Sequence, residues 1–490
     1  MRLMSFAPAL ALVIGADTLL QACSDSSSAM STHEELAPHT GASQLARDQL
    51  LDPETCKGCH PQHYREWASS MHAYAAEDPV FAAMNRRGQR ETNGELGDFC
   101  VRCHAPMAVR EGATHDGLNL PELPRKLQGV TCYFCHNSVD VTEPFNNQLV
   151  LANDTTMRGA PTDPVPNGAH HSAYSGSHDR NRAESSRLCG GCHDVVTPRG
   201  VHLERTFDEY QRSLFGKQGT GFETCSGCHM PALPGPVARG VELQRSRHEH
   251  LWPGVDTALT TFPDRAVQQR AVECELSLSA LIYEITQDDL GGLTVRLETL
   301  AGHDQPSGAA LHRRLWLELT AYDEKDQVVF ESGTLQADEL EQKPPQAADF
   351  DPQLALFRAW AYDADGREAQ MFWNAAASPE YPQGYASLTL PAQLTPRTAH
   401  TLDATYQIPS FARVERIDLR LRMRALGMDV LADLVASGDL EEAVLDEQPT
   451  FTLHGAAVEY RPKTRTTQPL WPDDLNCPDS YRCLLDPDGC

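Results

Sequence analysis

The chain has 490 residues, of which 41% are hydrophobic and 22% charged, and its formal net charge is −27 at pH 7. The length is that of two or three domains, and the ordinary composition excludes a disordered or collagen-like chain. The negative charge argues against a nucleic-acid partner, because binding to phosphates needs a basic surface.

The amino-terminal 22 residues have the pattern of a bacterial export signal. Arg2 precedes an apolar run that is too short to span a membrane, and the run ends in Leu-Gln-Ala before Cys23. This ending resembles the lipobox of bacterial lipoproteins, in which the cysteine becomes the lipidated first residue of the mature chain. We therefore predict a signal peptide over residues 1–22 and a polar, lipidated tether over residues 23–51 that anchors the protein to a membrane. The alternative is an ordinary signal peptide followed by an unmodified cysteine.

One short motif, Cys-x-x-Cys-His, occurs five times between residues 52 and 255 and takes up ten of the 15 cysteines. About 0.02 copies are expected by chance from this composition, so the repetition has a chemical cause. The copies are Cys56, Cys59 and His60; Cys100, Cys103 and His104; Cys132, Cys135 and His136; Cys189, Cys192 and His193; and Cys225, Cys228 and His229.

The spacing of the motif suits one cofactor. Two thiols three residues apart can form thioethers with the two vinyl groups of a haem, and the adjacent histidine can bind the iron as its proximal ligand. A zinc site has no need of a histidine after every cysteine pair, and a thioredoxin-like redox site explains one copy but not five. We therefore predict five covalently attached haem c groups, with the proximal ligands His60, His104, His136, His193 and His229.

Residues 52–255, called the motif segment below, offer about 41 residues for each haem. Because so short a segment cannot build an ordinary aliphatic core, the porphyrins are expected to form the core, covered by short helices and loops. Hydrophobic spacing predicts helices over residues 61–84 and 206–216, and Gly and Pro interrupt the rest. The predicted fold of this segment is a mostly α-helical and irregular haem-cored domain.

Nine further histidines of the motif segment are candidates for the sixth iron ligand, because a neutral imidazole binds iron well. The predicted distal ligands, chosen for their sequence contexts, are His72, His171, His178 and His250. His72 follows His60 by twelve residues on a predicted helix, so we expect it to bind the iron of another motif. For each histidine the alternative is a surface or hydrogen-bonded residue. Met107 and Met230 closely follow motifs, but packing against a haem is the favoured role for both.

Four stretches of the motif segment resemble the cytochrome c-552/c-554 family. They are CKGCHPQHYREWASSMH, CVRCHAPM, GVTCYFCH and TCSGCHMP. The resemblance implies electron transfer through stacked haems with mostly bis-histidine ligation, and it gives His72 a distal role. The founding members of the family are tetrahaem and lack a long β-rich extension, whereas this chain has five motifs and such an extension. The same broad group includes hydroxylamine oxidoreductase and multihaem nitrite reductase, so an enzyme is the alternative.

Residues 256–470, called the β-segment below, alternate between apolar and polar residues and carry most of the negative charge. The clearest predicted strands cover residues 292–300, 314–322, 386–390 and 416–426, and one helix is expected over 428–438. We predict an all-β, immunoglobulin-like sandwich. The turn AGHDQPSG at residues 301–308 is similar to a turn in β-domains appended to multihaem cytochromes. His303 in that turn can reach a haem, but a role in capping the turn is favoured.

The remaining cysteines, apart from Cys23, are expected to form two disulfides in an exported protein. They are Cys274, Cys477, Cys483 and Cys490, and three pairings are open. Each of the three pairings joins Cys274 to the Cys-rich tail, residues 471–490.

The sequence therefore predicts an exported pentahaem cytochrome c, placed in the periplasm or on the outer membrane, whose partners are other redox proteins or cytochromes. The first alternative is an oxidoreductase that acts on a small nitrogen or sulfur compound at one haem without a distal ligand. The second is a structural subunit whose acidic β-segment docks other cytochromes. Five low-spin irons favour electron transfer, and a high-spin iron favours the enzyme.

Overall fold

The computed structural model describes residues 44–335, 351–394, 400–472, 475–478 and 480–485, and these all belong to one compact unit. The predicted signal peptide, Cys23 and most of the tether lie outside the described residues. No helix in the described ranges is long and apolar enough to cross a membrane.

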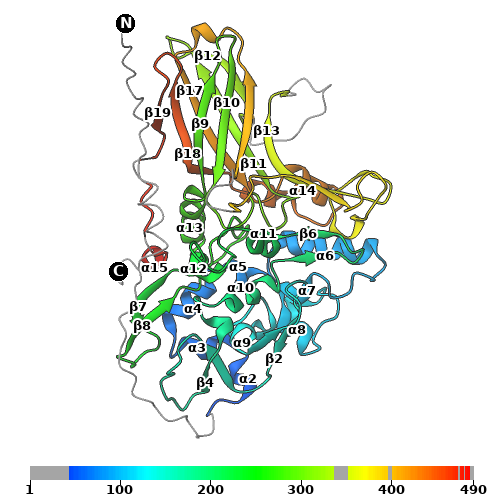
Figure 1. Ribbon diagram of the computed structural model, residues 1–490. Coiled ribbons are helices and arrows are strands. Elements are labelled where there is room, and N and C mark those ends of the chain that lie inside the picture. Colours follow the sequence, from blue (N-terminus) through cyan, green and yellow to red (C-terminus); the bar gives the residue numbers. More distant parts are fainter. Residues whose placement is uncertain (1–43, 336–350, 395–399, 473–474, 479, 486–490) are drawn as a thin grey trace. The chain divides into compact units, whose positions relative to one another are not determined.

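The motif segment is built from short helices joined by loops (Figure 1). Its helices, with the one before it, are α2 (Arg47–Leu50), α3 (Pro53–Lys57), α4 (Pro61–Ala68), α5 (Met71–Tyr74), α6 (Pro79–Glu91), α7 (Val101–His104), α8 (Pro106–Arg110), α9 (Cys132–His136), α10 (Ala183–Gly190), α11 (Thr206–Arg212) and α12 (Cys225–His229). Short 3-10 helices are η1 (Leu120–Glu122), η2 (Arg125–Leu127) and η3 (Gly176–His178). The predicted helix over 206–216 is thus confirmed in its first two turns.

The predicted helix over residues 61–84 is in fact three helices, α4, α5 and α6. The Ser70 side chain accepts a hydrogen bond from the backbone N–H of Ala73 and so starts α5. The Asp78 side chain accepts from the N–H of Val80, and Pro79 occupies the first position of α6. Both are typical helix starts, so the backbone changes direction twice where hydrophobic spacing alone suggested one straight helix.

Four small strand pairs complete the motif segment. They are β1 (Ser138–Val141) with β2 (Leu149–Leu151), β3 (Thr156–Gly159) with β4 (His171–Tyr174), β5 (Val195–Val196) with β6 (His202–Glu204), and β7 (Ala232–Pro236) with β8 (Gln244–His248). An apolar cluster that includes the buried Val101, Met107, Tyr133 and Phe134 lies beside the second and third motifs. The protein therefore adds a core of its own to this segment, and Met107 packs within it.

The β-segment consists of two antiparallel sheets and their helices (Figure 1). The smaller sheet has the order β16 (Thr401–Gln407), β10 (Gly292–Thr299) and β9 (Ala280–Gln287). The larger sheet has the order β14 (Glu368–Ala369), β13 (Ala355–Tyr362), β11 (Arg314–Tyr322), β17 (Arg416–Arg424), β18 (Phe451–Arg461) and β19 (Thr466–Pro469), with β12 (Val328–Ser332) on β11 and β15 (Tyr385–Leu388) on β13. Its helices are α13 (Arg265–Ser277) and α14 (Met428–Ala436), with the 3-10 helices η4 (Phe372–Asn374), η5 (Phe411–Arg413) and η6 (Glu442–Glu447). The tail contains the short helix α15 (Arg482–Leu485).

The two sheets share one hydrophobic core. Val295 and Leu297 of β10 lie in the same buried cluster as Leu317 and Leu319 of β11 and Leu419 of β17. This alternation of buried residues is the one that the sequence pattern predicted, and the four predicted strands and α14 are confirmed. The finer expectation of an immunoglobulin-like connectivity stays a prediction, as do the domain boundaries.

The tail is attached to the start of the β-segment by a disulfide between Cys274 and Cys477, which are 203 residues apart. Of the pairings left open by the sequence, this bond selects one, and Cys483 is disulfide-bonded as well. Cys274 belongs to α13, a helix that the sequence pattern did not predict, and it is buried with Leu251 and Tyr481. The expected connection between Cys274 and the tail is confirmed.

Candidate haem-binding sites

Each motif contains a turn of helix that brings its two cysteines and its histidine together. The backbone N–H of His60 donates to the carbonyl of Cys56 at 2.8 Å, and His193 donates to Cys189 at 3.0 Å. This bond from residue i to residue i−4 places the side chains on neighbouring positions of one helical turn. The ten motif cysteines form no disulfide, so all of their thiols are available for thioethers.

The proximal imidazoles are oriented by hydrogen bonds to the backbone. In four of them Nδ1 donates to a carbonyl far along the chain, and this leaves Nε2 with the lone pair that a metal needs. The bonds are His60 to Val237 at 2.6 Å, His104 to Ala75 at 3.0 Å, His136 to Arg158 at 2.5 Å and His229 to Pro253 at 3.0 Å. The chemistry of these donors therefore fits haem c.

Burial favours the neutral form of four of the five proximal histidines. Loss of solvent lowers the pKa of His60, His104 and His136 below the ordinary value. It also lowers the pKa of His193 to about 4, with a smaller contribution from His229. Since iron binds the unprotonated imidazole, the fold favours the ligand form at neutral pH.

Pairs of imidazoles face each other at the separation that a bound iron requires. An Fe–N bond of about 2 Å on each side places the centroids of two trans imidazoles about 6.3 Å apart. The observed distances between ring centroids are 6.4 Å for His60 and His170, 6.2 Å for His72 and His193, 6.1 Å for His136 and His250, and 6.4 Å for His229 and His303. Four of the five motifs thus have a second imidazole at a fitting distance.

His72 lies opposite the fourth motif. Its ring is nearly perpendicular to that of His193, at 83°, and the ring centroid of Trp252 lies 4.6 Å from that of His72. Burial lowers the pKa of His72 to about 3. The helix start at Ser70 sets the direction of the backbone at His72. The carbonyl of His72 accepts from the N–H of Val130 at 2.8 Å. His72 thus lies opposite the histidine of the fourth motif and not that of the first, and its role as an iron ligand stays a prediction.

The third motif has two histidines beside His136. His250 donates from Nδ1 to the carbonyl of His248 at 3.0 Å, so Nε2 is left for a metal. His178 stacks closer, at 5.2 Å, but its Nε2 donates to the carbonyl of Cys135. The Nδ1 of His178 is buried and without a hydrogen-bond partner in the described structure. Both predicted ligands thus lie beside His136, and within the described ranges a different ring nitrogen is free of hydrogen bonds in each.

The structure places His170, and not the predicted His171, beside the first motif. His170 donates from Nδ1 to the carbonyl of His171 at 2.9 Å and stacks on His60. His171 begins β4 and has no ring contact with a proximal imidazole in the described ranges. The sequence indicates that one of these two histidines is a candidate, but residue spacing alone does not tell which of two neighbouring side chains points toward His60.

The second motif differs from the other four. Among the described residues, no second histidine ring pairs with His104. The ring of Phe81 instead stacks flat on its imidazole, with centroids 4.2 Å apart and planes 5° apart. The sixth ligand of this iron is therefore not identified by the geometry that marks the others.

The motifs lie close to one another. The thiols of Cys56 and Cys132 are in contact, which brings the first and third motifs together. Contacts also join the second motif to the fourth and the fourth to the fifth, through the pairs Cys103–Cys192 and Cys189–Cys225. Cofactors attached at these cysteines are thus neighbours, as electron transfer between them requires.

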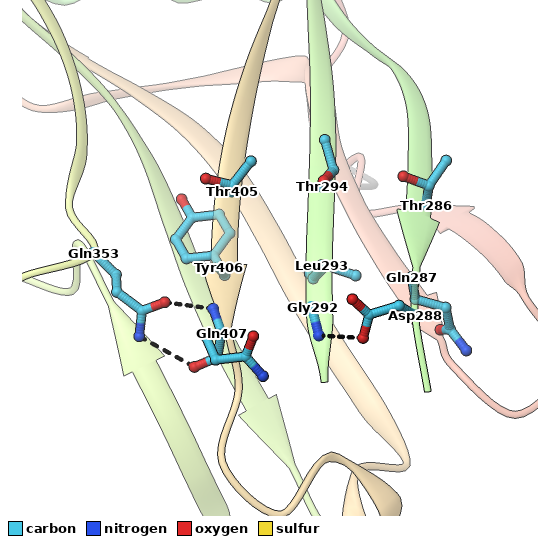
Figure 2. Close-up of a pocket in the computed structure, with 10 residues that line it drawn as sticks. All are labelled: Thr286, Gln287, Asp288, Gly292, Leu293, Thr294, Gln353, Thr405, Tyr406 and Gln407. Atoms are coloured by element: carbon cyan, nitrogen blue, oxygen red, sulfur yellow. Dashed lines mark hydrogen bonds between the residues drawn. The ribbon is translucent and has the colours of Figure 1, made fainter. Parts of the chain in front are cut away.

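The hollow drawn in Figure 2 belongs to the β-segment and holds no motif residue. It has a volume of about 490 Å³ and lies along the ends of β9, β10 and β16. Gln353 bonds the backbone of Gln407, and Asp288 accepts from the N–H of Gly292 at 2.8 Å (Figure 2). These polar groups already have partners within the fold.

Residues 55–137, which contain the first three motifs, match the family described as cytochrome c554 and c-prime. These residues form a multihaem c-type cytochrome segment, and the resemblance read from the sequence is confirmed. Proteins of this class bind haem c and transfer electrons in general, in exchange with other redox proteins.

Most of the chain is similar in structure to a penta-heme cytochrome c552 from Thermochromatium tepidum. The TM-score is 0.57 at 22% sequence identity, and the match covers 84% of this chain and 99% of that chain. At this identity the likeness shows the fold alone, which is cytochrome-like over most of the chain. No curated protein matches the chain significantly.

Proposed function

We propose that the chain is an exported pentahaem cytochrome c that passes electrons between redox partners through closely packed, mostly bis-histidine haems. The observation that carries the proposal is the set of four imidazole pairs, each formed by a proximal histidine and a second histidine 6.1 to 6.4 Å away. Its partners are other redox proteins or cytochromes.

The residues of the chain have three tasks in this function. The motif thiols hold the cofactor, whose iron supplies the change of oxidation state. The backbone carbonyls that accept from Nδ1 fix the ring orientation, and burial favours the neutral form of His60, His104, His136 and His193. Two imidazole ligands give a lower potential than a histidine–methionine pair, so we expect low midpoint potentials. A spectroelectrochemical titration tests the function: all haems should be reduced and reoxidised reversibly, and irreversible or absent reduction would contradict it.

The first prediction concerns the number of haems. Each of the five motifs should hold one covalent haem, so the denatured protein should retain five per chain in a pyridine haemochrome assay. The host must have an active maturation system. Three or fewer haems per chain under those conditions would show that some motifs have another role.

The second prediction concerns the anchor at Cys23. If this residue is lipidated, the variant Cys23→Ala should move the protein from the membrane fraction to the soluble fraction, because stable anchoring takes at least two acyl chains. Fractionation followed by immunoblotting measures the change. An unchanged membrane fraction argues against a lipidated Cys23 and against the proposed periplasmic or outer-membrane lipoprotein.

One observation bears on an enzymatic alternative, in which a small nitrogen or sulfur compound reacts at an open haem. His104 has no paired imidazole among the described residues, so the second motif is the place to look for such a site. A high-spin signal in the wild type that shifts on addition of cyanide would favour this alternative. A wild type with only low-spin irons would leave electron transfer as the function.

A further inference from the structure

The turn between β10 and β11 carries a histidine that faces the fifth motif. We propose that His303, from the β-segment, is the sixth ligand of the haem attached at Cys225 and Cys228, opposite His229. This inference rests on the proposed function and extends it, because it makes the β-segment part of a haem site. The motif segment then does not contain all of the iron ligands.

The geometry of the pair is that of two trans ligands. The ring centroids of His229 and His303 are 6.4 Å apart and the ring planes differ by 11°. The separation equals that of His60 and His170, and it matches the distance of about 6.3 Å expected for two imidazoles on one iron. A direct contact between stacked rings would be shorter, so the pair leaves room for an atom between its members.

The hydrogen bonds of His303 leave the metal-binding nitrogen available. Nδ1 donates to the carbonyl of Asp304 at 2.9 Å, and within the described structure Nε2 has no hydrogen bond. His229 has the same arrangement, since its Nδ1 donates to Pro253. Burial lowers the pKa of His303, which favours the neutral ring. A histidine that only caps a turn needs neither a facing imidazole nor a dry environment.

The turn is held in place by the motif segment. Glu209 of α11, which lies between the fourth and fifth motifs, accepts from the N–H of Asp304 at 3.2 Å and from the hydroxyl of Ser307 at 2.6 Å. Ser307 also bonds the hydroxyl of Thr206 at 2.8 Å. These contacts hold the residues that directly follow His303 against α11, so the position of the turn is fixed by the motif segment.

A second contact fixes the other end of the same connection. Arg313, just before β11, pairs with Asp256 through two bonds of 3.1 and 2.9 Å, and its Nε donates to the carbonyl of Ser307. A bidentate pair of this kind defines direction as well as distance. The segment from His303 to β11 is thus anchored at three points, as a ligand-bearing loop requires.

The test uses three variants of His303, which distinguish a role as an iron ligand from a role in shaping the turn. Asparagine keeps the polar turn chemistry but does not bind iron strongly, so H303N should convert one haem in five to high spin in the electron paramagnetic resonance spectrum. Methionine can bind iron, so H303M should stay low-spin with the midpoint potential of one haem raised. H303G should be high-spin at one haem and return to low spin on addition of imidazole.

The matched control is His312, a buried histidine of the same segment. Its Nε2 donates to the carbonyl of Gln370 at 2.5 Å and its ring contacts Phe372, and no ring contact joins it to a proximal histidine among the described residues. H312N should leave the spin state of every haem as it is in the wild type.

Two results would overturn the proposal. An all-low-spin H303N protein with full haem content shows that His303 only shapes the turn. If H303N does not fold, H303M decides, because unchanged potentials of all haems in H303M also exclude a ligand role. Either result leaves the proposed function intact as long as the wild type holds five haems and is reduced reversibly. Fewer haems or irreversible reduction in the wild type is the separate failure of that function.

Discussion

Replacing His72 with alanine should convert one of the five proposed haems, the one attached at the fourth motif, from low spin to high spin. His72 faces His193 with ring centroids 6.2 Å apart, and no other histidine ring contacts His193 among the described residues. Loss of the strong-field imidazole leaves the iron five-coordinate or water-bound. The other irons keep their ligands, so one fifth of the haem should change in the absorption and electron paramagnetic resonance spectra.

The angle between the rings makes this experiment specific. The planes of His72 and His193 differ by 83°, whereas those of the other three fitting pairs differ by 11° to 28°. Nearly perpendicular imidazoles give a strongly anisotropic low-spin signal, and nearly parallel ones give a rhombic signal. His72→Ala should therefore remove the anisotropic signal and leave the rhombic ones. The control is His115→Ala, at an exposed histidine; an all-low-spin His72→Ala protein with full haem content would exclude the ligand role.

Replacing Glu66 with alanine should lower the free energy of unfolding by about 3–5 kcal/mol, since it leaves a buried charge without its partner. Glu66 is fully buried, and its carboxylate lies 3.2 Å from the guanidinium of Arg247, which is 3% exposed. The same carboxylate accepts from the backbone N–H of His250 at 3.1 Å. The change therefore also loosens the loop that places His250 opposite the third motif.

Urea unfolding followed by circular dichroism measures the effect of Glu66→Ala. The control is Glu184→Ala, because the pair of Glu184 and Arg182 is 3.9 Å apart and more than half exposed, and such surface pairs contribute at most about 1 kcal/mol. Adding Arg247→Met to Glu66→Ala should recover part of the loss, since it removes the unpaired charge. Equal, small effects of the two single variants would show that the buried pair does not stabilise the fold.

The sequence was most informative about features that depend on residues close together in the chain. The five motifs lie within single helical turns, and the strands of the β-segment follow an alternation of period two, so both could be read residue by residue. The breaks at Ser70 and Asp78 were also readable, because each residue is a typical helix start. Helix α13 was missed because its buried face includes the polar Gln268, which bonds the backbone of Ala258 and Ser69 and weakens the apolar pattern.

The pairing of histidines was harder to predict because it depends on tertiary structure. His170 and His171 are neighbours with the same chemistry, and only the fold around β4 brings one of them to His60. His303 lies in a turn whose local pattern suggests capping, and its approach to His229 is set by α11 and the Arg313–Asp256 pair. Contacts between residues that are far apart in the chain have no local signature, so the structure was needed to find them.

The four imidazole pairs have a consequence for the unfolding of the chain. With iron bound, each pair closes a loop, and the loops overlap in sequence: the one from His60 to His170 encloses His72 and His136, whose partners lie beyond it, and the last runs from His229 to His303. Because these loops overlap, breaking the iron bond of one histidine pair gives the chain little additional freedom while the other pairs stay bound. Residues 60–303 should therefore unfold cooperatively in one step, because breaking a single pair gains almost no chain entropy.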